Sequence, residues 1–320
     1  MKRRLMIWGA AWMLLFSACA PAEVPTPEAP PVEAVAENPP ATEPDGTEIP
    51  CVHTDFPLVA RQLSAASAPV LSGTLCGAIL PHYAPAMQMG ADLLAARETP
   101  PDTIVILAPN HAGDGAPVQI CGASYVWDGG GMAGDPALAA ALAEALSLSP
   151  DDRAAGEDWS ASLHVPYLSA YFPEAQIVTI LLSRGADAAA LQTLGESLAA
   201  LAAARELFVL SSVDFSHEQT PDTAARCDRE TQRLLLDGEP SALLPLGNDY
   251  LDSPESAAVL MYYADACGLT LMLQDSHIEH FIEDGRQKTG SYYAYALIKA
   301  DGDVPADGAG QAADDQSAPE

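Results

Sequence analysis

Apolar residues along this chain gather in short continuous runs that are separated by longer amphipathic stretches. Six of these runs predict β-strands, at residues 77–80, 103–107, 118–121, 177–182, 207–211 and 292–298. Several lack the alternation of apolar and polar positions that is typical of a half-buried strand. We therefore expect strands that are covered on both faces.

Helical periodicity occupies the stretches between these runs, at residues 85–97, 135–146, 187–204, 220–236 and 253–266. Two of the stretches begin with Asp135-Pro136 and Ser253-Pro254, a capping residue followed by proline at the first helical position. Alternation of buried strands with helices predicts a three-layer α/β/α domain around a mainly parallel or mixed sheet.

The first 19 residues have the pattern of a signal peptide. A basic start at residues 2–4 precedes an apolar run at 5–16, which is too short for a permanent membrane span. The ending Phe16-Ser-Ala-Cys19 resembles a bacterial lipoprotein box, although Phe16 stands where that box prefers leucine. The resemblance implies acylation of Cys19 and an exported protein anchored on the extracytoplasmic face of a membrane. A plain secretory signal, cut after Ala18 or Ala20, is the alternative.

Two segments of biased composition flank the predicted domain. Residues 20–50 are dominated by Pro, Glu, Ala and Thr, and residues 301–320 by Asp, Ala and Gly. Neither segment has enough large apolar side chains to offset the entropy of ordering, so we expect a disordered tether and a disordered acidic tail. The remaining residues, 51–300, suffice for one α/β domain.

The charge of the chain limits its partners. Its 44 acidic and 14 basic side chains give a formal net charge of −30. Nucleic acid is excluded as a partner, because binding a phosphate backbone requires clustered Lys and Arg. The unknown partner that we expect is a small molecule.

Cysteine spacing does not indicate a zinc or redox motif, because the chain has no CxxC pair. Lipidation of Cys19 would leave an odd number of cysteines, so at most two disulfides could form. The sequence does not choose among the connectivities of Cys51, Cys76, Cys121, Cys227 and Cys267.

Three histidines follow predicted strands: His82, His111 and His217. Open α/β sheets bind ligands at the carboxyl ends of their strands, so separate stretches of chain can bring imidazoles into one crevice. We interpret the pattern as a metal site. His53, His277 and His280, in an entry segment and a predicted polar loop, are expected to be solvated.

Four motifs occur in the order of a known family: Ile79-Leu-Pro-His82, Leu107-Ala-Pro-Asn-His111, Ser162-Leu-His-Val-Pro-Tyr167 and Ser211-Ser-Val-Asp-Phe-Ser-His217. They resemble the Memo-like family, whose bacterial members are called AmmeMemoRadiSam system protein B. The resemblance covers most of residues 75–298. It implies a fold similar to that of class III extradiol dioxygenases, which are non-haem iron enzymes, with His82 and His111 as metal ligands.

The third ligand departs from the family pattern. Eukaryotic members use a cysteine, whereas the equivalent stretch here is Leu251-Asp-Ser-Pro-Glu-Ser256, which places Asp252 at that position. Two imidazoles and one carboxylate suit a divalent metal, with Fe(II) favoured and zinc or copper as alternatives. Glu255, His217 or water remain alternatives for the third position, and Asp252 could instead precede a helix as a cap.

The resemblance leaves catalytic roles for residues near the metal. His217 would act as an acid or base, since a histidine pKa lies close to neutrality. Asp214 could orient an imidazole or hold a water, or could simply bond nearby backbone amides. His164 matches a family histidine and is expected to line the same pocket.

Other departures weaken the enzymatic interpretation. Where many members have Glu-His-Ser-x-Glu-x-His, this chain has Asp158-Trp-Ser-Ala-Ser-Leu-His164, so Trp159 and Ser162 replace polar groups. Tyr83 adds a bulky ring beside His82. Two hypotheses therefore stand: a metal-dependent oxidoreductase or hydrolase acting on a small molecule, and a non-catalytic protein that binds metal or ligand in a degenerate pocket. A third, an interaction scaffold for phosphopeptides, lacks a basic cluster to receive phosphate.

Overall fold

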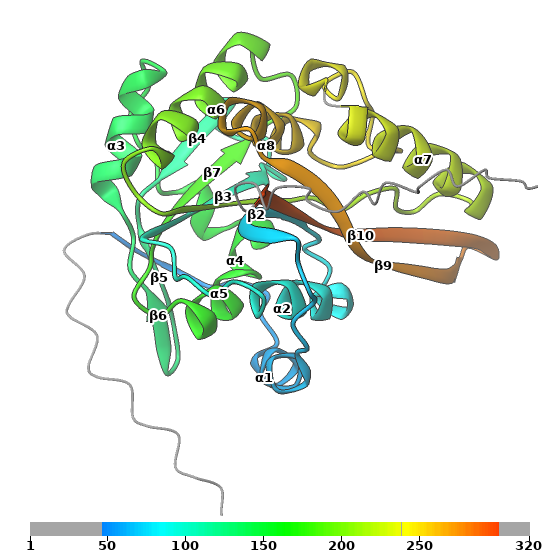
Figure 1. Cartoon of the computed structure of the whole chain (residues 1–320). Helices are drawn as coiled ribbons and strands as arrows, with labels where there is room; N and C mark the ends of the chain where they lie inside the picture. Colours follow the sequence, from blue (N-terminus) through cyan, green and yellow to red (C-terminus); the bar gives the residue numbers. More distant parts are fainter. Residues whose placement is uncertain (1–46, 238, 301–320) are drawn as a thin grey trace, which may run out of the picture. The chain divides into compact units, whose positions relative to one another are not determined.

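The centre of the protein is a seven-stranded mixed sheet with strand order β4-β7-β3-β8-β2-β10-β9 (Figure 1). The computed structural model describes residues 47–237 and 239–300. The sheet strands are β2 (Gly73–Leu80), β3 (Thr103–Pro109), β4 (Val118–Cys121), β7 (Gln176–Leu182), β8 (Leu207–Ser212), β9 (Thr270–Glu283) and β10 (Arg286–Ala300). Strands β7, β3, β8 and β2 pair in parallel, while β4, β10 and β9 pair antiparallel. The predicted mainly parallel or mixed sheet is therefore confirmed.

Two helical layers cover this sheet. One face packs against α3 (Pro136–Ala145), α6 (Ala188–Ala202), α7 (Pro221–Asp237) and α8 (Pro254–Cys267). The other face packs against α1 (Phe56–Ala65), α2 (Gln88–Leu94), α4 (Trp159–Ser162) and α5 (Val165–Tyr171), together with a small sheet of β1 (Glu48–Pro50), β5 (Ser124–Trp127) and β6 (Gly130–Met132). In Figure 1 the first helical group lies above the sheet and the second below it. The three-layer α/β/α prediction is confirmed.

Strand β3 shows why its sequence is continuously apolar. Ile104 and Ile106 face the core under α2 and α5, whereas Val105 and Leu107 face the core under α6 and α8. All four side chains have no exposed surface. A strand with a core on each side gains from apolar residues at every position, so the usual alternation disappears.

Helix starts follow the predicted capping chemistry. The Asp135 carboxylate accepts the Leu138 N–H at 2.9 Å, and the Ser253 hydroxyl accepts the Ser256 N–H at 3.2 Å. Each cap satisfies one of the amide donors that the first turn of a helix leaves free. Proline follows both caps, as predicted.

Three predictions about elements were wrong. The stretch 85–97 is a 3-10 turn followed by the shorter helix α2. The segment assigned to the tether contains β1, which pairs in parallel with β5 and buries Ile49, so ordered structure begins before residue 51. The presumed polar loop that carries His277 and His280 belongs to β9, which forms a hairpin with β10.

Several predictions fall outside the described residues: the signal peptide, Cys19, most of the tether and the acidic tail. In the described part of the chain the five cysteines are all free thiols. Among the helices of that part, none has the length and apolar character needed to span a membrane.

Candidate metal centre

The carboxyl ends of three adjacent strands define the site. His82 follows β2 and His111 follows β3, each by two residues, and Asp214 follows β8 by two residues. Because β8 lies between β2 and β3 and all three are parallel, these side chains emerge at one edge of the sheet.

Asp252 joins this edge from the loop that precedes α8. Its N–H donates to the Asp214 carbonyl at 3.1 Å, and its carboxylate accepts the Asp214 N–H at 3.2 Å. An antiparallel bridge between Phe215 and Leu251 holds the same two segments together. The start of α8 is thus attached directly to the chain that leaves β8.

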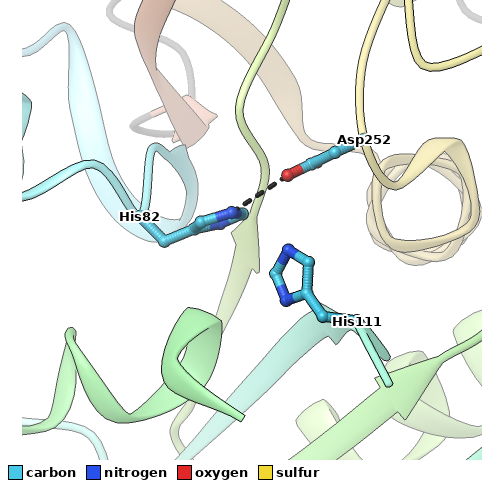
Figure 2. A group of neighbouring side chains, drawn as sticks. All are labelled: His82, His111 and Asp252. Carbon is cyan, nitrogen blue, oxygen red and sulfur yellow. Dashed lines mark ion pairs between the residues drawn. The ribbon is translucent and has the colours of Figure 1, made fainter. Parts of the chain in front are cut away.

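His82, His111 and Asp252 converge (Figure 2). One donor atom from each lies within 4.8 Å of the other two. The His82 Nε2 is 3.0 Å from a carboxylate oxygen of Asp252, and the two imidazole rings meet edge to face with centroids 5.3 Å apart. Two imidazoles and a carboxylate are a donor set that binds divalent transition metals.

The Ser212 hydroxyl determines which nitrogen of His82 faces the centre. This hydroxyl contacts the Ser160 carbonyl at 2.7 Å, and both His82 Nδ1 and His164 Nε2 at 3.0 Å. A carbonyl can only accept, so Ser212 donates its single proton to Ser160 and accepts N–H bonds from both imidazoles. His82 therefore carries a proton on Nδ1, and its Nε2 faces Asp252.

An anionic acceptor orients the ring of His111 in the same way. The carboxylate of Asp158 lies 3.2 Å from the His111 Nδ1 and accepts the His111 backbone N–H at 2.9 Å. Burial raises the pKa of Asp158, but hydrogen bonds from His111 and Ser160 outweigh burial and leave its pKa lowered. A charged Asp158 keeps the proton of His111 on Nδ1 and leaves Nε2 free for a metal.

The negative charges of Asp214 and Asp252 beside His82 require a proton or a metal ion at its Nε2. Burial lowers the pKa of His82, yet Asp214 and Asp252 outweigh it and raise that pKa to about 9. A neutral His82 would point the lone pair of Nε2 at the Asp252 carboxylate, which is repulsive. A proton or a metal ion at Nε2 removes the conflict, so the residues present fit a divalent ion.

Asp214 lies beside His82, and one of its two carboxylate oxygens accepts a hydrogen bond. Its Oδ1 accepts the His82 N–H at 3.0 Å, while its Oδ2 is 3.8 Å from His82 Nε2. Burial raises the pKa of Asp214, and the negative charge of Asp252 raises it further against the opposing effect of His82. Asp214 therefore supports the His82 backbone and presents a second carboxylate oxygen next to the centre.

The other predicted site residues lie further from the three donors. His217 is half-buried, and its Nδ1 donates to the Phe215 carbonyl at 2.8 Å. His164 is 1% exposed, and burial lowers its pKa to about 3, so it is a neutral group behind Ser212. Glu255 is buried in the first turn of α8 and accepts the Gly185 N–H at 2.9 Å. Among the described residues, the converging group contains none of these three.

The positions that depart from the family pattern have contacts of their own. Trp159 stacks on His111 with centroids 4.2 Å apart, and the Ser162 hydroxyl donates to the Val52 carbonyl at 3.0 Å. Tyr83 stacks on Tyr292 with centroids 4.3 Å apart. A cavity of about 510 Å³ opens beside His111, with Trp159 in its wall.

The sequence reasoning missed Ser212 and Asp158 as the residues that orient the two imidazoles. Both lie within quoted motifs, but no sequence signal distinguishes their roles from those of neighbouring polar residues. Ser212 is 130 residues from His82, and Asp158 is 47 residues from His111.

A family model described as Memo-like protein matches residues 70–268 of this chain. The chain belongs to the Memo-like family. A MEMO1 family protein of Pyrobaculum aerophilum is 30% identical to it over 194 residues, which is 57% of this chain and 67% of that protein. A MEMO1 family protein of Pyrobaculum arsenaticum is 28% identical over 155 residues, 47% of this chain and 54% of that protein.

Among solved structures, an uncharacterized protein from Escherichia coli K12 aligns with this Memo-like chain at a TM-score of 0.46 and 19% identity. The alignment covers 68% of this chain and 99% of the other. The predicted family is thus confirmed by the family model and by the relatives.

Ser212→Ala is predicted to lower the free energy of unfolding by about 1–3 kcal/mol, because it leaves the Ser160 carbonyl and the His164 Nε2–H without partners in a buried region. Urea unfolding measures the loss. Ser197→Ala is the matched control: its exposed hydroxyl bonds only the Thr193 carbonyl within α6, and we expect a change below about 0.5 kcal/mol. Equal effects of the two substitutions would contradict the assigned network.

Proposed function

We propose that this Memo-like protein holds a divalent metal ion between His82, His111 and Asp252 and uses it in a reaction on a small oxygenated molecule. One observation carries the proposal: Ser212 and Asp158 contact the Nδ1 atoms of the two imidazoles, so that the opposite nitrogen of each ring is directed toward the group that includes Asp252. Imidazoles held through the opposite nitrogen by buried acceptors are typical of metal ligands.

Fe(II) is the favoured ion, because two imidazoles and a carboxylate form the donor set of non-haem iron oxygenases. Zinc and copper are the alternatives. When bound, such an ion supplies Lewis acidity or activates water or dioxygen. The chain itself contributes the free Oδ2 of Asp214, which is near enough to the centre to exchange a proton with a substrate. His217, on the same loop, is the further acid or base of this proposal.

The second candidate function is non-catalytic binding of metal or ligand. It is favoured by Trp159 and Tyr83, whose rings occupy space beside His111 and His82. Ser162, where the family has glutamate, bonds backbone and offers no acid or base. Non-catalytic binding of a metal differs from the first candidate function only in that no reaction follows, whereas binding of another ligand would not require the ion.

Metal analysis tests the ion binding that the catalytic function and the metal-binding form of the second function share. Wild-type protein purified without chelator is expected to hold about one divalent ion per chain. His82→Ala should lose it, because the remaining two ligands do not hold an ion tightly; we expect at least about a 100-fold rise in the dissociation constant. Asp265→Ala, an exposed carboxylate on α8, is the control and should keep full occupancy.

Asp252→Ala separates the ligand assignments. Loss of the ion in this variant supports Asp252 as the third ligand, while retention of full affinity would move that position to Glu255, His217 or water. A wild-type chain without stoichiometric metal, or unchanged occupancy in His82→Ala, would contradict the metal centre itself.

Oxygen uptake separates enzyme from binder. The Fe(II)-loaded chain is expected to consume dioxygen when catechols are added, and Asp214→Asn should lower kcat at least about tenfold while the bound iron stays unchanged. The Asp265→Ala control should match wild type. Absence of uptake in a fully iron-loaded chain across substituted catechols favours the non-catalytic binder over ring opening.

We also propose that the protein is an exported lipoprotein, held to the extracytoplasmic face of a membrane by acylated Cys19. The support is the charged and apolar start of the chain, which ends in Phe16-Ser-Ala-Cys19. Cys19→Ser is expected to move the protein from the membrane fraction to the soluble fraction, whereas Cys267→Ser should leave it in the membrane. Mass spectrometry that finds an unmodified Cys19 in the mature protein would overturn the anchor.

A further inference from the structure

Strand β9 forms one edge of the large sheet, and the described residues place no further strand beyond it. Apolar side chains along it are exposed: Leu273 at 46%, Ile278 at 45% and Ile282 at 71%. The strand is 14 residues long and contains neither proline nor lysine, the residues that commonly protect such an edge. A long apolar edge of this kind favours pairing with another strand.

Hydrogen bonds on the neighbouring strand show where the β9 backbone points. Thr289 and Ser291 of β10 donate their N–H groups away from β9, to the carbonyls of Gln219 at 2.7 Å and Ser216 at 2.8 Å. Across the ladder, Thr289 lies opposite His280 and Ser291 lies opposite Ile278. In an antiparallel pair, residues opposite such positions also turn their N–H and C=O outward. His280 and Ile278 therefore direct backbone donors and acceptors at the open edge.

We propose that β9 pairs with β9 of a second copy of this chain, antiparallel and around a two-fold axis, so that two sheets become continuous. A two-fold contact brings one residue opposite itself. With the axis at His280, the exposed Ile278 packs against Ile282 of the partner subunit, and each N–H at the edge meets a carbonyl. The two most exposed apolar side chains of the regular part of the strand are then covered.

The polar side chains favour the same pairing. With the axis at His280, His277 lies opposite Glu283 of the partner subunit, and the symmetric contact repeats this pair. An axis one residue earlier would place Glu279 against its own copy, which like-charge repulsion disfavours. The register at His280 uses residues 277–283 and so avoids the irregularity of the ladder near Gln274. The edge is thus complementary to itself in its exposed isoleucines and its backbone hydrogen bonds, and this register places no carboxylate opposite its own copy.

Cysteine crosslinking of the full chain tests the contact directly. His280→Cys is expected to give a disulfide-linked dimer under mild oxidation, because directly opposed, hydrogen-bonded residues lie about 5.5 Å apart between Cα atoms, within disulfide range. Val70→Cys, fully exposed outside the sheet, is the matched control and should give no crosslinked dimer. A crosslink at Ile278→Cys instead of His280→Cys also supports β9 pairing and moves the axis to Ile278.

Sedimentation measures the same association without a crosslink. The full chain is expected to dimerise with concentration, and the double variant Ile278→Lys, Ile282→Lys should weaken the dimer at least tenfold, while Val70→Lys should leave it unchanged. Unaltered thermal unfolding of the double variant verifies that its fold is intact.

Three outcomes would overturn the proposal. The first is a chain that stays monomeric at all concentrations and forms no crosslink at either position. The second is open-ended aggregation in place of a closed dimer. The third is protection of the outward amides of Ile278 and His280 from hydrogen exchange in the monomer, which would mean that another segment of the same chain covers the edge.

Discussion

The single proton of the Ser212 hydroxyl governs the geometry of the candidate metal centre. Because this proton goes to the Ser160 carbonyl, the hydroxyl can only accept from His82 and His164. The ring of His82 is thereby held with Nε2 toward Asp252, where a carboxylate at 3.0 Å demands a cation. A proton or a metal ion at that position satisfies the carboxylate, and the three converging donors make a divalent ion the occupant that we propose.

The order of the strands in the sheet also determines the geometry of the candidate metal centre. His82 and His111 come from strands that are separated by β8, and Ser212 is the last residue of β8 itself. One strand therefore carries the group that orients a ligand on its neighbour, and the loop after it carries Asp214, which binds the His82 backbone. Asp252 belongs to the same unit, because it exchanges two hydrogen bonds with Asp214 beside the bridge between Phe215 and Leu251. The ligands are thus positioned by rigid elements rather than by free loops.

Trp159, Tyr83 and Asp252 depart from the family pattern, and each departure has its own physical consequence. Trp159 stacks on a face of His111 in the wall of the neighbouring cavity, and Tyr83 stacks on Tyr292, so neither ring removes a donor from the group. As the third ligand that we propose, Asp252 would supply an oxygen donor, which favours harder metals than a sulfur donor does. The chain brings together three side chains that could hold a metal ion but has an aromatic ring stacked on one of them, and for this reason a reaction and simple binding are distinct proposals.

Local signals in the sequence determined much of this protein. Continuous apolar runs marked the buried strands, Asp135 and Ser253 marked helix starts, and histidines after strands marked the edge where ligands gather. The hairpin of β9 and β10 also has a local signal that was overlooked: Asp284-Gly285, with both residues at positive φ, is a turn that suits such a hairpin. Only the tertiary structure decided that Asp252 reaches the centre, that Ser212 and Asp158 orient the imidazoles, and that His164 lies behind them. Those decisions depend on hydrogen bonds between residues as far as 130 positions apart, and periodicity along a chain carries no information about contacts of that kind.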